Sequence, residues 1–266
     1  MFNLFIALAA SASFVSAQSL GSLGLSSSCQ GALTAILGNA QAASCLNIVG
    51  ALPILQTTAN QSLVDPLVTW ASGLCAAAPC DNSTLSALTT NITTGCSSDL
   101  NRIDVSVDNV NEIITIVQEV YPTLRDILCL QDTSKNESCV NETLSDIQSA
   151  IGQPLSINAI IDFNTTLASI SNPQALICTD CVQAAYDVAL QNPLLASEKN
   201  GVVSVLSTEC GSNFTSGSSP TDISTSAASA ATSSQSTTNA GSRSKGELAT
   251  SWSFATFLLF GFLQAL

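Results

Sequence analysis

Residues 108–129 read DNVNEIITIVQEVYPTLRDILC, and this stretch decides the fold class. Its apolar side chains recur every three or four positions and form one continuous stripe along a helix. The stripe consists of Val110, Ile113, Ile114, Val117, Val120, Tyr121, Leu124, Ile127 and Leu128. Because proline lacks the N–H that a helix interior needs, we expect Pro122 to kink or restart the helix. The stretch predicts a long amphipathic helix with one buried face.

The chain on either side shows the same helical pattern in shorter pieces. Residues 28–50 carry apolar side chains at helical spacing. Asp65 is followed by a proline, which is typical of an N-cap and the first helical position. Asp81 can cap a further short helix, and residues 142–151 and 180–191 have amphipathic stripes of their own.

Strand signals are few. The best is the short alternation of Ile103, Val105 and Val107. We therefore predict an all-α, disulfide-stapled domain over residues 25–212.

The chain has ten cysteines, an even number that predicts five disulfides in a secreted protein. They are Cys29, Cys45, Cys75, Cys80, Cys96, Cys129, Cys139, Cys178, Cys181 and Cys210. The close pairs at 75 and 80 and at 178 and 181 also admit a zinc or a redox interpretation. The chain has no histidine and no βαβ pattern around the second pair, so structural bridges are favoured. The pairing is not deducible from the sequence.

The order of the cysteines suggests an internal duplication. Five of them lie in residues 25–105 and five in residues 106–212, and each set runs single, single, close pair, single. The spacings differ between the sets, and chance similarity is the alternative. We predict two pseudo-repeats.

Both ends of the chain resemble segments that are removed on maturation. Residues 1–17 have a short apolar run and a small-x-small cleavage site, which predicts a secretory signal peptide. Residues 240–266 comprise small residues, a polar spacer and a terminal apolar tail, the pattern of a glycosylphosphatidylinositol (GPI) signal. We predict lipid attachment at Asn239. The alternatives are an uncleaved anchor at the front and a single membrane-spanning helix at the back.

Residues 213–239 are dominated by serine and threonine and predict a disordered, O-glycosylated stalk. The chain also contains seven Asn-x-Ser/Thr acceptors for N-glycans. They are Asn60, Asn82, Asn91, Asn136, Asn141, Asn164 and Asn213. Charged residues make up 9% of the chain, against about 25% in an average soluble protein, so glycans are the expected source of solubility. The net charge of −13 argues against nucleic acid as a partner.

Few residues indicate catalysis. The absence of histidine excludes Ser-His-Asp and Cys-His mechanisms and histidine-ligated metals. Asp132-Thr-Ser has the form of an aspartic-protease motif, but it occurs once and in a loop-like stretch. Asp104, Asp108 and Glu112 could serve glycoside hydrolysis or bind calcium, although a solvated helix face is the simpler interpretation. We expect no catalytic, cofactor-binding or metal-binding residues.

Four segments carry a resemblance to a known family. They are TWASGLCAAAPC (69–80), TTGCSSDL (93–100), YPTLRDILCL (121–130) and CTDC (178–181). In these segments the chain resembles a family of fungal secreted, cysteine-rich domains of unknown function that are often GPI-anchored. The resemblance covers about residues 28–214. It implies a cell-surface or wall-associated protein and transfers no catalytic residue.

We expect a non-enzymatic surface glycoprotein with a structural, adhesive or contact role. Its expected partners are the outer leaflet of the plasma membrane, through the lipid, and cell-wall polysaccharide. One alternative is an extracellular carrier of a small hydrophobic ligand in a helical, disulfide-bound cavity, because the low-charge helices are rich in leucine, isoleucine and valine. A second is a carboxylate-dependent glycan-active enzyme.

Overall fold

The computed structural model describes residues 25–102, 107, 109–161, 170–197 and 199–227 and confirms a mostly helical, disulfide-stapled domain. The predicted signal peptide, the attachment residue Asn239 and the predicted GPI signal lie outside the described residues. Among the helices that the structure describes, none is both long and apolar enough to span a bilayer.

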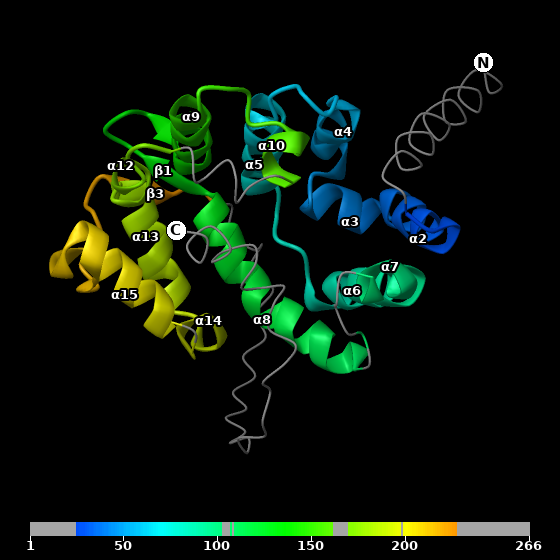
Figure 1. Cartoon of the computed structure of the whole chain (residues 1–266). Helices are drawn as coiled ribbons and strands as arrows, with labels where there is room; N and C mark the ends of the chain where they lie inside the picture. Colours follow the sequence, from blue (N-terminus) through cyan, green and yellow to red (C-terminus); the bar gives the residue numbers. More distant parts are fainter. Residues whose placement is uncertain (1–24, 103–106, 108, 162–169, 198, 228–266) are drawn as a thin grey trace.

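The described part of the first half contains helices and connecting loops but no strand (Figure 1). Its helices are α2 (Ser27–Leu37), α3 (Ala40–Cys45), α4 (Ile48–Gln56), α5 (Val64–Ala76), α6 (Asn82–Gly95) and α7 (Ser97–Asn101). The second half adds three short strands to its helices. Its helices are α8 (Val110–Leu128), α9 (Cys139–Ile151), α10 (Ile157–Ile161), α12 (Gln174–Ile177), α13 (Asp180–Leu190), α14 (Pro193–Ser197), α15 (Lys199–Cys210) and the 3₁₀ helix η1 (Ser212–Thr215).

The long helix predicted from residues 108–129 is α8. Asn109 caps it by accepting a hydrogen bond from the Glu112 N–H, and the helix continues through Pro122 without a break. Figure 1 shows α8 crossing the middle of the molecule, with α6 and α7 near one end and α13 to α15 along its other side. The helix therefore packs against both halves of the chain.

The helical pattern of residues 28–50 is divided among α2, α3 and the start of α4. Asn39 interrupts it because its side chain accepts from the Ala42 N–H and starts a new helix. Asn47 makes the second break with a left-handed φ of 48°, and its amide donates to the Trp70 carbonyl on α5. A local hydrogen bond of Asn39 and a bond from Asn47 to a distant helix thus override the helical periodicity.

The two predicted aspartate caps have different outcomes. Asp81 is the N-cap of α6 and accepts from the Thr84 N–H. The helix predicted to be capped by Asp65 begins two residues earlier, at Val64 rather than Pro66, so Asp65 lies in its first turn, where a negative charge favours the helix dipole.

A small antiparallel sheet is the largest departure from the predicted fold. Its three strands are β1 (Leu130–Asp132), β2 (Glu137–Ser138) and β3 (Ile223–Thr225), in the order β2-β1-β3. The short strand-like alternation at 103–107 lies outside the described residues except for Val107, which is not in a strand.

Asp132 holds the turn between β1 and β2. Its carboxylate accepts from the Ser134 hydroxyl (2.6 Å) and from the N–H groups of Ser134 (2.9 Å) and Lys135 (3.1 Å). These bonds, above all that from the hydroxyl, lower the pKa of Asp132 from 3.8 to about 2. The Asp-Thr-Ser motif therefore has a structural explanation.

The predicted boundary between domain and stalk at residue 212 needs correction, because the folded part continues to residue 227. Phe214 is buried in the core, and β3 pairs with β1 so that Ile223 lies opposite Asp132. The Ser219 hydroxyl donates to Asp187 on α13 at 3.0 Å. The remainder of the predicted stalk, 228–239, lies outside the described residues.

All ten cysteines are paired, as the sequence predicted. The bonds are Cys29–Cys96, Cys45–Cys80, Cys75–Cys129, Cys139–Cys181 and Cys178–Cys210. The bond from Cys75 to Cys129 joins the two predicted halves. Beside it, the buried Arg125 donates to the carbonyls of Leu74 and Cys75 at 3.2 Å each. This side chain therefore provides hydrogen-bond donors to backbone carbonyls at the C-terminal end of α5, which have no partner within the helix.

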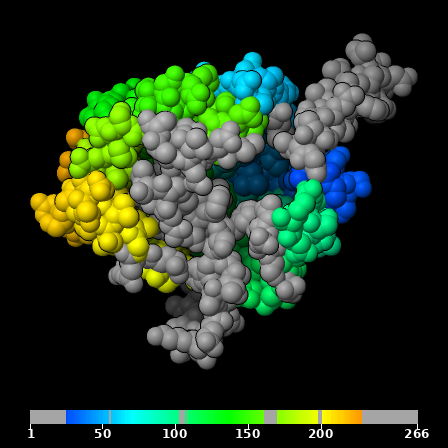
Figure 2. Space-filling model, viewed as in Figure 1, coloured from blue at the N-terminus to red at the C-terminus, as the bar shows by residue number. Residues whose placement is uncertain are grey.

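The core is divided into small clusters, each with three to five buried apolar residues. Two of the clusters contain buried half-cystines, for example Cys45 and Cys80 beside Leu85. Figure 2 shows the first helices and the last on opposite sides of the molecule. Small clusters bury little surface, so the cross-links supply stability that a single large core would otherwise provide.

Candidate functional site

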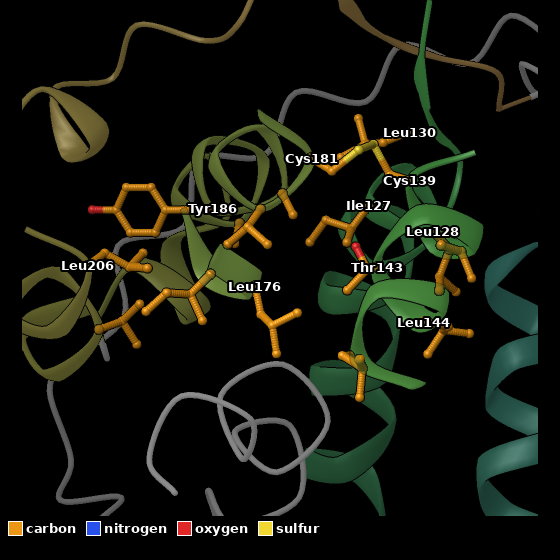
Figure 3. A pocket seen from close by; sticks show the side chains of 17 residues that line it. Ile127, Leu128, Leu130, Cys139, Thr143, Leu144, Leu176, Cys181, Tyr186 and Leu206 are labelled. Carbon is orange, nitrogen blue, oxygen red and sulfur yellow. A yellow bond between two sulfur atoms is a disulfide. The ribbon is translucent and has the colours of Figure 1, made fainter. Parts of the chain in front are cut away.

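The main feature that could bind a ligand is a partly open cavity of about 340 Å³ in the second half of the described chain (Figure 3). Helices α9 and α13 form two of its walls, and α8, β1, α12 and α15 supply the rest. The lining residues are Ile127, Leu128, Leu130, Cys139, Val140, Thr143, Leu144, Ile147, Leu176, Ile177, Cys181, Val182, Ala185, Tyr186, Ala189, Val202 and Leu206.

The two main walls share one spacing. Helix α9 lines the cavity with residues 139, 140, 143, 144 and 147, and α13 does so with residues 181, 182, 185, 186 and 189. Steps of one, three and four place these side chains on one face of each helix. The two helices therefore face each other across the cavity with matching apolar stripes.

Local sequence fixes where these two helices begin. Ser138 caps α9 by accepting from the Asn141 N–H, and Thr179 caps α13 by accepting from the Val182 N–H. The bond from Cys139 to Cys181 then joins their first turns, with the two Cα atoms 5.3 Å apart. The covalent link holds the walls together at one end, whether or not the space between them is filled.

The wall is almost entirely apolar. Among the described residues that line the cavity, Thr143 and Tyr186 carry the only side-chain hydroxyls. Burial raises the pKa of Tyr186, and Figure 3 shows its hydroxyl pointing away from the other labelled side chains. The Thr143 hydroxyl lies inside the ring of labelled side chains. Such a surface suits an apolar molecule with at most one small polar group.

The charges next to the cavity are already paired. Lys135 donates to Glu142 at 2.5 Å and lies 3.4 Å from the Asp132 carboxylate. The bond to Glu142 raises the pKa of Lys135. Glu142 is buried on α9, next to Thr143, and its Oε2 lies 3.4 Å from the sulfur of Cys181. These groups form the polar edge of the α9 wall.

The predicted glycan acceptors mostly lie on the surface. Asn60, Asn82, Asn91, Asn136 and Asn213 are exposed. Asn141 is half-buried in the first turn of α9, and its amide donates to Glu137 at 2.6 Å. Asn164 lies outside the described residues.

Of the three carboxylates considered for catalysis, Asp104, Asp108 and Glu112, the structure describes only Glu112. Asp104 and Asp108 lie outside the described residues, and the Glu112 side chain accepts from Asn109 at the start of α8. Among the described residues, no three side chains of the metal-binding types come together.

Sequence reasoning found the apolar stripe of residues 180–191 but not the cavity in front of it. The stripe contains four of the five α13 residues that line the cavity, namely Val182, Ala185, Tyr186 and Ala189. The apolar stripe on α9 was a further sequence signal that could have pointed to the second wall of the cavity. A stripe shows which face of a helix is apolar, whereas the space left in front depends on packing between distant segments.

No family model, no curated protein and no solved structure matches this chain. The resemblance to fungal secreted domains therefore stays a prediction from the sequence.

Proposed function

We propose that this chain is an extracellular surface glycoprotein whose helical domain holds a small apolar molecule. The observation that carries the proposal is the cavity of about 340 Å³, lined by apolar side chains between the disulfide-linked helices α9 and α13. Of the three roles left open by the sequence, that of a carrier makes direct use of this feature.

The extracellular setting is supported by the cysteines and the surface. Five disulfides and no free cysteine are typical of proteins from an oxidising compartment. The exposed acceptor asparagines are compatible with N-glycans on the folded domain. The signal peptide and the GPI anchor are proposed from the sequence patterns of residues 1–17 and 240–266.

A structural or adhesive role in the cell wall is the second candidate. Its support is the combination of disulfides with five exposed glycan acceptors. Such a role has no need for the cavity, so ligand content distinguishes the two candidates.

The test is native mass spectrometry of the full chain after secretion from a fungal host. Treatment with a phosphatidylinositol-specific phospholipase first releases the protein from the cells, which tests the anchor separately. We expect an additional small mass that is lost on collisional activation. The variant Ala185→Phe places a ring in the cavity and should lack this mass, whereas Ala87→Phe, at an exposed site on α6, should retain it.

If every preparation has the mass of the ligand-free protein and the protein binds clearly to a carbohydrate array, these results would favour the adhesive role over the carrier role. A protein that the phospholipase does not release, and that retains residues 240–266, would refute the lipid anchor alone.

A further inference from the structure

We propose that the cavity takes an uncharged single-chain amphiphile with a terminal hydroxyl, such as a medium-chain alcohol, and that Thr143 binds that hydroxyl. This inference rests on the proposed function and names the class of ligand. Three observations support it: the size of the cavity, the state of the Thr143 hydroxyl and the distribution of charge.

The cavity volume favours a small ligand. At about 340 Å³, the cavity lies at the lower end of the range for small-molecule sites, roughly 300–1,000 Å³. A single chain of about ten carbons with one oxygen is a slender ligand that suits a site of this size, whereas bulkier lipids would have to project from the open side.

The hydroxyl of Thr143 is available for a ligand. Thr90 and Thr115 also lie in helices, and each donates to the carbonyl four residues earlier, at 2.8 Å and 2.9 Å. Thr143 is half-buried, and among the described residues its hydroxyl has no hydrogen-bond partner, a state that it shares with other helix threonines such as the exposed Thr69. Of the two hydroxyls on the described lining residues, that of Thr143 lies among the labelled side chains in Figure 3, whereas that of Tyr186 points away from them.

The charge distribution favours a neutral ligand over a fatty-acid anion. Of the described cationic side chains, Arg125 binds the carbonyls at the end of α5 and Lys135 is paired with Glu142. Arg102 is paired with Asp99, which follows α6. No cationic side chain is among the described residues that line the cavity, so a carboxylate buried there would have no counter-ion from the described lining.

The experiment compares 1-decanol with decanoate at pH 8 by isothermal titration calorimetry on the delipidated full-length glycoprotein. Thr143 is also the third residue of the Asn141 acceptor sequence, so Thr143→Val removes a hydroxyl and a possible glycan together. Asn141→Gln is the matched control, because it removes the glycan acceptor, together with the hydrogen bond to Glu137, and keeps the Thr143 hydroxyl. Thr90→Val controls for the loss of a helix threonine outside the cavity.

We expect decanol to bind the parent protein at least tenfold more tightly than decanoate. Thr143→Val should weaken decanol binding about threefold to tenfold, the effect of one neutral hydrogen bond, whereas both controls should bind like the parent. Equal or tighter binding of decanoate would overturn the neutral-ligand inference while leaving the carrier function intact. Unchanged decanol binding in Thr143→Val would overturn the role of Thr143. Failure of both probes to bind would count against the proposed function itself and point to occupation of the cavity by the chain's own residues or by a second copy.

Discussion

Replacing Ala185 with phenylalanine should stabilise the ligand-free protein. Ala185 lies half-buried on α13 in the wall of the cavity, between Val182 and Ala189 on the same face. The new ring would enter space that the structure leaves open and would contact the apolar side chains of α9 opposite. No polar group has to lose a hydrogen bond to make room for it.

The size of the effect follows from burial and entropy. Full burial of a phenylalanine side chain contributes about 1.5–3 kcal/mol, and fixing its rotamer costs roughly 0.5–1 kcal/mol. Partial exposure at the open side of the cavity reduces the gain, so we expect about 1 kcal/mol, within the usual range for cavity filling. In a domain of this size, that corresponds to a rise of about 2–4 °C in Tm.

The assay is urea unfolding of delipidated protein, followed by circular dichroism, with Ala87→Phe as the control. Ala87 is exposed on α6, and its substitution should change the free energy of unfolding by less than about 0.5 kcal/mol. A loss of about 1–3 kcal/mol in Ala185→Phe is the signature of an overfilled core. That result would refute the presence of an open cavity at this position.

Three further predictions concern the scaffold and its modification. Replacing Cys75 and Cys129 together with alanine opens a link that spans 54 residues, so loop-closure entropy predicts a loss of about 4 kcal/mol in urea unfolding, and a loss below about 1 kcal/mol would contradict it. The pKa of Asp132 is lowered from 3.8 to about 2 in the folded protein, so its stabilising contribution is present above pH 4 and is lost as the pH falls toward 2. Asp132→Asn should therefore flatten the decline in Tm between pH 4 and pH 2. An unchanged decline would refute the stabilising role of the Asp132 carboxylate. Asn141 is half-buried and hydrogen-bonded, so glycopeptide mapping should find it less occupied than the exposed Asn91, and the reverse order would contradict this structural ranking.

The sequence predicted those elements whose signal lies within one segment. Residues 110–128 and 180–190 form helices because their apolar side chains repeat with the helical period, and Asp81 caps because its carboxylate bonds a group three residues away. Asn39 and Asn47 were missed because their side chains compete with a helical pattern that is otherwise intact.

The remaining features depend on distant segments. Strands β1 and β3 have three residues each and pair across more than ninety positions, which leaves no local periodicity to detect. The same applies to the link between Cys75 and Cys129, which crosses the boundary of the predicted halves. The cavity depends on the distance between α9 and α13. The apolar pattern of either helix alone does not predict that distance.

The most direct measurement is nuclear Overhauser spectroscopy of decanol bound to the methyl-labelled protein. The account predicts contacts between the alkyl chain and the methyl groups of Leu144, Leu176 and Val182, half-buried residues on three different walls of the cavity. Saturable binding with contacts only to methyl groups elsewhere, or no contacts at all, would contradict the claim that this space exists to hold an apolar molecule.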